Sequence, residues 1–205
     1  MVKKSFTFDN FYVCEENKIA FLAAQRVIEM PGVIFNPLYI YSGVGLGKSH
    51  LLGAIYLAFS TKLKTKLVNG LEFVDELKKD TVQNFKNGIY EADCFIFDDL
   101  HLLENNREAL SEFFHILEKF LIEDRQVIVS ANVSPHELRN FDPKIISRLE
   151  GGLVCELGHF KDISRVNVLK KKAEERGLIL PDEIAVEISQ IVTGSVRELE
   201  GALNR

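Results

Sequence analysis

The chain has 205 residues, of which 46% are hydrophobic and 27% are charged, a composition typical of an ordinary soluble globular protein. The length suits one α/β domain with a small appendage. No apolar run is long enough to cross a membrane and the first residues lack an apolar signal core, so we expect no membrane span and a cytoplasmic location. A formal net charge of −5 argues against an autonomous duplex-DNA binder, which usually has a basic surface.

The first elements of the chain lead up to one glycine-rich loop. Residues 5–14 form an aromatic lead-in whose phenylalanines need a groove in which to be buried. Residues 15–30 have the apolar spacing of a helix, which Pro31-Gly32 ends. A short apolar strand over residues 38–41 then enters the loop, and a largely apolar helix over residues 49–59 follows it.

This loop has the layout of a phosphate-binding loop, although a glycine-rich turn is the plain alternative. Glycines let backbone N–H groups approach phosphate oxygens, and the start of the helix adds partial positive charge. Lys48 would reach the β and γ phosphates, and the Ser49 hydroxyl would ligate Mg²⁺. The strict pattern has glycine where this chain has Ser42, which we interpret as a tolerated change. The expected nucleotide-binding residues are Gly43, Val44, Gly45, Leu46, Gly47, Lys48, Ser49 and His50.

Strands and helices alternate through the middle of the chain. The segment at 71–88 is weakly helical, with a break near Asp80-Thr81. The expected strands are 66–69, 94–97, 125–130 and 153–157, and the expected helices are 110–121 and 143–148. Only helices follow Gly158. The pattern predicts an α/β fold with a parallel sheet: residues 1–157 form a nucleotide-binding core with the lead-in, and residues 158–205 form a small C-terminal α-helical lid.

Polar side chains follow two of the buried strands. Asp98 would steady the water shell of Mg²⁺, and Asp99 would orient an attacking water. Asn132 can hydrogen-bond the γ phosphate or that water. An acidic turn and an ordinary turn residue are the plain alternatives for these positions.

Two arginines complete the expected constellation. Arg148 lies on a short helix after a proline, from which it could reach a neighbouring subunit's γ phosphate. Arg197 lies in the first turn of the last helix, after a Ser195 capping-box start, where it could reach its own subunit's nucleotide. Taken one at a time, each arginine is more often a solvated surface residue.

The whole chain resembles the ATPase domain of DnaA, the bacterial replication initiator of the AAA+ class. The matching segments are Phe6-Thr-Phe-Asp-Asn-Phe11, Asn36-Pro-Leu-Tyr-Ile-Tyr41, Gly43-Val-Gly-Leu-Gly-Lys-Ser-His50, Glu112-Phe-Phe-His115, Ser147-Arg148, Glu150-Gly-Gly-Leu153 and Val196-Arg-Glu-Leu-Glu-Gly-Ala-Leu-Asn-Arg205. The resemblance implies a P-loop AAA+ core, binding of ATP or ADP, and the Walker A and Walker B motifs. It implies a first-sensor role for Asn132, a trans-acting arginine finger at Arg148 and a second sensor at Arg197.

The chain departs from the family in places that concern DNA. Family members usually have Asp-Arg at Asn132-Val133 and arginine at Lys144, and their basic single-strand contacts align with Asn106 and Glu108. The segment at 73–85 is shorter than the family's initiator-specific helices, and no helix-turn-helix domain for duplex DNA follows in this sequence. Nucleotide binding is therefore the firmer expectation.

Two functions from different classes remain. The first is an ATP-binding, slowly hydrolysing module that acts in replication initiation through ATP-dependent homo-oligomers and single-stranded DNA. The second is a regulatory paralogue, or a helicase loader, that binds DnaA, the replicative helicase or other replication proteins without opening DNA.

Overall fold

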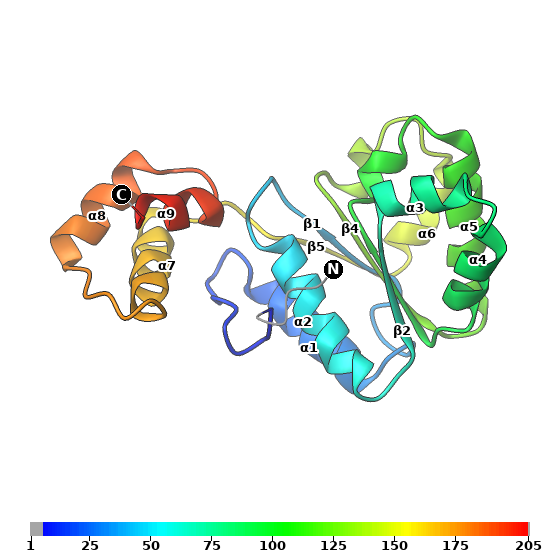
Figure 1. Cartoon of the computed structure of the whole chain (residues 1–205), viewed down its shortest axis with the longest axis horizontal. Coiled ribbons are helices and arrows are strands. Elements are labelled where there is room, and N and C mark those ends of the chain that lie inside the picture. Colours follow the sequence, from blue (N-terminus) through cyan, green and yellow to red (C-terminus); the bar gives the residue numbers. More distant parts are fainter. Residues whose placement is uncertain (1–5, 205) are drawn as a thin grey trace.

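Five parallel strands form one sheet in the order β2-β3-β4-β1-β5 (Figure 1). The structure, a computed structural model, describes residues 6–204. The strands are β1 Leu38–Tyr41, β2 Thr65–Asn69, β3 Cys94–Asp98, β4 Gln126–Ala131 and β5 Leu153–Glu156. Because β1 lies between β4 and β5, the strand order reverses beside the loop that follows β1. Ligands of parallel sheets bind at such positions, outside the carboxyl ends of the strands.

The two faces of the sheet are covered by two different layers of helices, as Figure 1 shows. Alternate side chains of β3 divide between the layers: Cys94 and Ile96 pack towards α1 and α2, and Phe95 and Phe97 pack towards α3, α4, α5 and α6. Both sets are buried, which explains why this strand is apolar throughout. The helices are α1 Lys18–Glu29, α2 Lys48–Ser60, α3 Gly70–Leu77, α4 Val82–Tyr90, α5 Arg107–Ile122 and α6 Pro143–Glu150, with short 3₁₀ turns η1 Leu100–Leu103 and η2 Pro135–Glu137.

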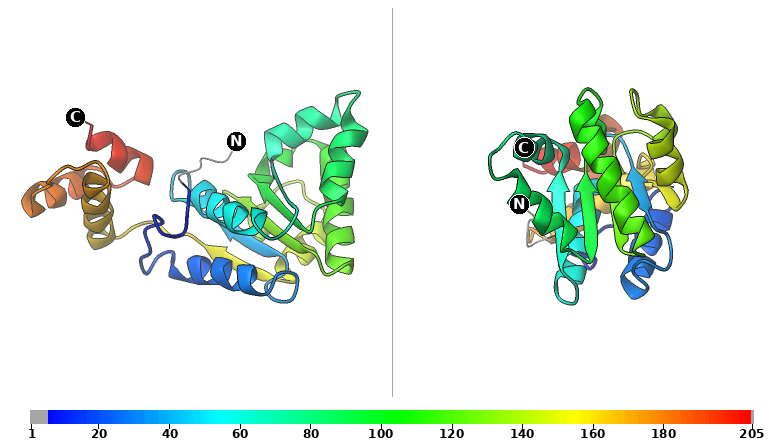
Figure 2. Two further views of the ribbon diagram at one scale, coloured as in Figure 1. Left: turned by 60° about the horizontal axis from the view of Figure 1, so that its bottom comes forward. Right: turned by 90° about the vertical axis from the view of Figure 1, so that its right-hand side faces the viewer.

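The last three helices pack around a small apolar cluster of their own. They are α7 Asp162–Glu174, α8 Asp182–Ile191 and α9 Val196–Ala202. Figure 2 shows them at one end of the molecule, joined to the sheet by the segment after β5. Their cluster includes Phe160, Val168, Leu169 and Leu199, and also Leu46 from the glycine-rich loop. The lid helices, α7 to α9, therefore contact the loop through an apolar side chain.

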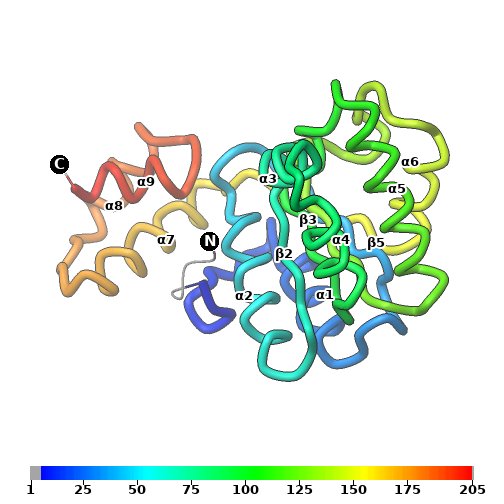
Figure 3. Tube along the Cα trace, turned by 45° about the vertical axis from the view of Figure 1, so that its right-hand side comes forward, coloured from blue at the N-terminus to red at the C-terminus, as the bar shows by residue number. Residues whose placement is uncertain are grey.

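The lead-in lies between the lid helices and α2, as Figure 3 shows. Phe11 is buried and packs on Phe21 of α1, and Phe8 meets the same ring edge-on. Phe8 and Phe11 of the lead-in therefore pack in a groove against α1, as the sequence predicts.

The prediction of an α/β fold with a parallel sheet and C-terminal helices is confirmed. The division at residue 157 into a core and a lid stays a prediction. Within residues 6–204, every helix is too short or too polar to cross a bilayer.

Candidate nucleotide site

The glycine-rich loop between β1 and α2 has the backbone that phosphate binding requires. Gly45 and Gly47 have φ values of 77° and 109°, which L side chains rarely adopt. Gly47 directly precedes α2, so the free N–H groups of that helix face the loop. Ser42 is not among the described residues with a positive φ, so serine in place of the pattern's glycine carries no backbone strain here.

Lys48 is held at the start of α2 by oxygens of the same loop. Its Nζ donates to the carbonyl oxygen of Ser42 at 2.7 Å and to that of Gly43 at 3.2 Å. The side chain is buried, and burial lowers the pKa of Lys48, although the carboxylates of Asp99 and Asp98 oppose the shift. A buried ammonium group needs acceptors, and phosphate oxygens are stronger ones than these carbonyl oxygens.

Asp98 ends β3 facing the first turn of α2. Its Oδ2 lies 3.4 Å from the Ser49 hydroxyl, and its Oδ1 accepts a hydrogen bond from the Ser130 hydroxyl of the adjacent strand β4. Burial raises the pKa of Asp98, and the Ser130 hydrogen bond opposes that shift. The sequence reasoning missed Ser130, because its partner lies 32 residues away.

Asp99 leaves the strand in a left-handed conformation, with φ 59° and ψ 51°. Its Oδ2 accepts a hydrogen bond from Nδ2 of Asn69, at 3.1 Å. Asn69 also caps α3 through its side-chain oxygen, so it connects Asp99 to that helix. The sequence analysis did not predict a site role for Asn69. The signal that could have indicated one is its position at the end of a strand that precedes β3.

Lys48, Ser49 and Asp99 line one cavity of about 770 Å³, which is a usual size for a small-molecule site, whereas Gly43 and Asp98 are not among its lining residues. Its wall is formed by the lead-in, the phosphate loop, the carboxyl ends of the strands and the lid helices. Seven of the eight predicted loop residues line it, as do Asp99, Asn132 and Arg197. The predicted residues on its wall are Val44, Gly45, Leu46, Gly47, Lys48, Ser49, His50, Asp99, Asn132 and Arg197.

His50 fastens the lead-in to α2. Its Nε2 lies 3.0 Å from the Thr7 carbonyl oxygen and 2.8 Å from Oδ1 of Asn10, and Phe6 stacks on its ring. Both partners are acceptors, so Nε2 carries the proton and donates. Burial lowers the pKa of His50. His50 therefore shapes the cavity wall through the lead-in.

The lid helices meet the phosphate loop directly. The Val196 N–H, at the start of α9, donates to the Gly45 carbonyl oxygen at 3.0 Å. A Cβ added at Gly45 would lie only 2.4 Å from Cβ of Ser195. Arg197, the next residue of α9, is exposed and lines the cavity.

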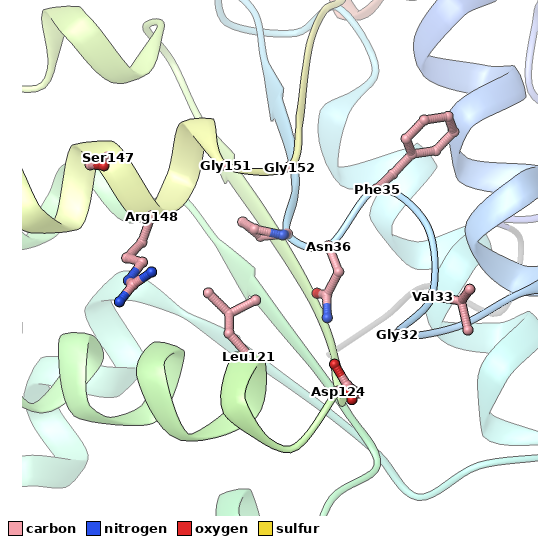
Figure 4. A pocket seen from close by; sticks show the side chains of 11 residues that line it. Gly32, Val33, Phe35, Asn36, Leu121, Asp124, Ser147, Arg148, Gly151 and Gly152 are labelled. Carbon is pink, nitrogen blue, oxygen red and sulfur yellow. The ribbon is translucent and has the colours of Figure 1, made fainter.

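Arg148 lies elsewhere. It projects from α6 towards α5, where it pairs with Glu118, and it lines a second cavity of about 530 Å³ beside Asn36 and Asp124 (Figure 4). Its side chain is 56% exposed. Within one chain it is therefore separate from the cavity that Lys48 and Asp99 line.

Two lysines in the region of α3 and α4 have acidic partners. Lys79 pairs with Glu76 at 2.6 Å, and Lys86 pairs with Glu112 at 2.7 Å. No such ion pair involves Lys78 or Lys144 in the described part of the chain. The surface of α3 and α4 is thus less basic than its lysines suggest.

The protein groups fit a magnesium ion only together with a nucleotide. Ser49 and Asp98 offer two hard oxygens 3.4 Å apart. Among residues 6–204, no group of three or more His, Cys, Asp or Glu side chains could hold a metal by itself. Mg²⁺ commonly takes one or two protein oxygens and completes its shell with waters and phosphates, so this donor set fits.

Three comparisons agree with this geometry. Residues 2–156 match the family model of the bacterial DnaA ATPase domain. The chromosomal replication initiator protein DnaA of Bordetella petrii is 34% identical over 97% of this chain, and this chain spans only 43% of that relative's length. A structure of the replication initiator DnaA bound to AMPPCP and single-stranded DNA superposes with TM-score 0.92 at 29% identity, covering 100% of this chain and 65% of that one. Domain III of the Thermotoga maritima DnaA superposes with TM-score 0.89 at 28% identity, covering 100% of this chain and 88% of that one.

The match to the family model covers more than half of the chain, and the similarity to the relative and to both structures continues through the lid helices. The predicted resemblance is therefore confirmed, and with it the AAA+ class of the fold. The chain belongs to the family of bacterial DnaA ATPase domains.

Proposed function

We propose that this chain binds ATP or ADP with Mg²⁺ in the 770 Å³ cavity, hydrolyses ATP slowly, and acts in the cytoplasm as an ATP-switched module of replication initiation. One observation carries the proposal: Lys48, Asp99 and the lid residue Arg197 line a single cavity. The triphosphate would lie on the loop, with Lys48 exchanging its carbonyl partners for phosphate oxygens. Mg²⁺, held by Ser49 and Asp98, would neutralise charge that builds up on the phosphates.

Hydrolysis would use a water beside the terminal phosphate. Asp99 orients that water through the oxygen that does not bind Asn69 and takes up its proton. Asn132 and Arg197, which both line the cavity, would contact the phosphates and register whether the terminal one is present. Because Arg197 belongs to α9, which also binds the Gly45 carbonyl oxygen, the nucleotide state would alter the position of the lid helices.

Arg148 supports assembly as part of this proposal. Its exposed position and its separation from its own cavity suit a residue that reaches the nucleotide of a neighbouring copy. Glu118 would hold the guanidinium ready for that contact. We expect ATP to promote homo-oligomers, measured by light scattering, and Arg148→Ala to abolish them while nucleotide affinity stays within about twofold.

The matched control is Arg26→Ala, which removes another exposed arginine that pairs with an acid on the surface. Assembly that is equally strong with ATP, ADP or no nucleotide would contradict the switch. Loss of assembly in Arg26→Ala as well would contradict a specific role for Arg148.

A second candidate is a DnaA-like regulator, or a helicase loader, that binds replication proteins without opening DNA. It is favoured by the net charge of −5 and by the acidic partners of Lys79 and Lys86. Fluorescence polarisation with labelled single-stranded DNA, with ATP or ADP across a salt series, separates the two candidates. Salt-sensitive binding that requires ATP supports the initiator module; no binding with nucleotide confirmed bound supports the regulator.

A further inference from the structure

Ser42 stands where the strict phosphate-loop pattern has glycine, so this chain has a hydroxyl group where the pattern has none. The residue follows β1 directly and is only 2% exposed. Its backbone N–H donates to the Ala131 carbonyl oxygen, at the end of β4, at 3.3 Å. The hydroxyl is therefore fixed at the start of the phosphate loop, between two central strands.

The Ser42 hydroxyl contacts the phosphate-binding lysine. Its Oγ accepts a hydrogen bond from Nζ of Lys48 at 3.1 Å and donates to the Gly43 carbonyl oxygen at 2.8 Å. Because the hydroxyl proton goes to Gly43, the lone pairs of Oγ are left for the ammonium group. Serine at position 42 thus adds one acceptor to the two carbonyl oxygens, of Ser42 and Gly43, that Nζ also contacts.

The protons of Lys48 Nζ are all committed to its own loop. An ammonium group has three protons, and the structure provides three loop oxygens for them, at 2.7, 3.1 and 3.2 Å. Contact with both the β and the γ phosphate needs at least two of these protons, so at most one loop contact can persist. The contact with the hydroxyl is longer than that with the Ser42 carbonyl oxygen, and we expect it to be lost.

An acceptor that is given up on binding opposes the binding. It stabilises the protein before the phosphates arrive and contributes nothing afterwards, so the ligand's affinity falls by the free energy of that hydrogen bond. Glycine at position 42 would leave Lys48 with carbonyl acceptors only. Since φ of Ser42 is not positive, alanine fits this backbone without strain, and the hydroxyl can be removed by itself.

We propose that the Ser42 hydroxyl restrains Lys48 and thereby lowers the affinity of the phosphate loop for ATP and ADP, which rests on the function proposed above. Ser42 is a positioning residue that acts through Lys48 and sets how tightly nucleotide is held. A loop with this hydroxyl exchanges ADP for ATP faster than the same loop with glycine.

The test compares wild type with Ser42→Ala, which removes the hydroxyl, and with Ser42→Gly, which restores the pattern. In calorimetric titrations with ADP and with a non-hydrolysable ATP analogue, each with Mg²⁺, both variants should bind at least about fivefold more tightly, because hydrogen bonds to charged groups are strong. Stopped-flow measurements should show slower ADP dissociation. Ser189→Ala is the matched control, because it removes a buried hydroxyl that donates to the Val186 carbonyl oxygen in α8, and it should bind as wild type.

A double-mutant cycle tests whether the hydroxyl acts through the lysine. In a Lys48→Ala background, Ser42→Ala should change ADP affinity by less than about twofold, because the partner of the hydroxyl is gone. A gain of the same size with and without Lys48 would overturn the restraint.

Unfolding measurements add a readout that separates the states with and without nucleotide. Without nucleotide, Ser42→Ala should unfold at a lower urea concentration than wild type, because it lacks the contact with Lys48. At saturating ADP the two proteins should unfold together, since the contact is absent from the bound state of both. An equal deficit with and without ADP would show that the contact persists on binding, and would overturn the proposal.

The titrations distinguish failure of the restraint from failure of nucleotide binding. Equal affinity in wild type and Ser42→Ala would leave nucleotide binding standing and overturn the restraint. Weaker binding by Ser42→Ala would also overturn it, because the hydroxyl would then support binding. Binding by Ser42→Ala but not by wild type would contradict the proposed function and support the restraint. Absence of binding in both would contradict both.

Discussion

Glu16 lies between the lead-in and α1 and is hydrogen-bonded to the start of the first lid helix, so its replacement by glutamine tests how the lid helices are held. Its carboxylate accepts hydrogen bonds from the Lys161 N–H at 3.1 Å and from the Ser164 hydroxyl at 2.9 Å. Its carbonyl oxygen accepts from the Gly158 N–H at 2.9 Å. Lys161 immediately precedes α7, so the Glu16 carboxylate caps that helix and meets the positive end of its dipole.

The lowered pKa of Glu16 indicates how much these hydrogen bonds stabilise the folded protein. Burial alone would raise it, but hydrogen bonds from the Cys14 thiol, from backbone N–H groups and from the Ser164 hydroxyl lower it from 4.5 to about 2. A difference of that size corresponds to roughly 3 kcal/mol between the two protonation states. Glutamine keeps part of the hydrogen bonding, so we expect Glu16→Gln to lower the free energy of unfolding by about 1–2 kcal/mol at pH 7.

The pH dependence has a definite sign. A carboxyl group with a lowered pKa in the folded state stabilises the protein above its unfolded pKa of 4.5, and this contribution disappears as the pH falls towards 2. The difference between wild type and Glu16→Gln should therefore persist at pH 5 and shrink progressively between about pH 4.5 and 2. Urea unfolding, followed by circular dichroism at several pH values, measures it.

Glu15→Gln is the matched control, because Glu15 is 85% exposed and its one ion pair among the described residues is with Lys161 Nζ, at 3.3 Å. It should change the free energy of unfolding by less than about 0.5 kcal/mol. If Glu16→Gln equals wild type at pH 7, or if its deficit is the same at pH 3 as at pH 7, the helix-capping account is wrong.

Two further substitutions address the loop and Asp99, the proposed catalytic base. Gly45→Ala should lower the melting temperature and weaken ADP binding, because its Cβ would lie 2.4 Å from Cβ of Ser195. Gly201→Ala, whose Cβ would have no described residue within 4 Å, should do neither, and equal effects in both variants would refute the contact. Asp99→Asn should bind ATP within about threefold of wild type but slow phosphate release at least tenfold, because asparagine tolerates the left-handed backbone but cannot take a proton. Unchanged release from the asparagine variant would remove Asp99 from the chemistry.

The sequence predicts those residues of the candidate site whose contacts are local. The phosphate loop was readable because Lys48 and its carbonyl partners lie within six residues of one another. Asp98 and Asp99 could be predicted as candidate site residues because a buried apolar strand ends at them. Local patterns also predict that Asn132 follows a strand and that Arg197 lies in the first turn of a helix; the structure has them after β4 and in α9.

Other parts depend on contacts between distant residues, and local patterns do not encode these. Asn69 meets Asp99 across two strands, and Glu16 reaches Ser164 across 148 positions. No local pattern singles out His101, which lines the cavity from the turn that follows Asp99. In the same way, no local pattern predicts that Lys86 pairs with Glu112, which lies 26 residues away.

The central claim is that nucleotide binds on the loop between the sheet and the lid helices. The most direct measurement is a titration of fluorescent ATP into wild type and Lys48→Ala, with Lys62→Ala, an exposed lysine outside the cavity, as the matched control. Wild type and Lys62→Ala should saturate with the same affinity, and Lys48→Ala should bind at least about tenfold more weakly, a difference of about 1.4 kcal/mol. Equal affinity in all three proteins, or no binding by wild type, would contradict the account.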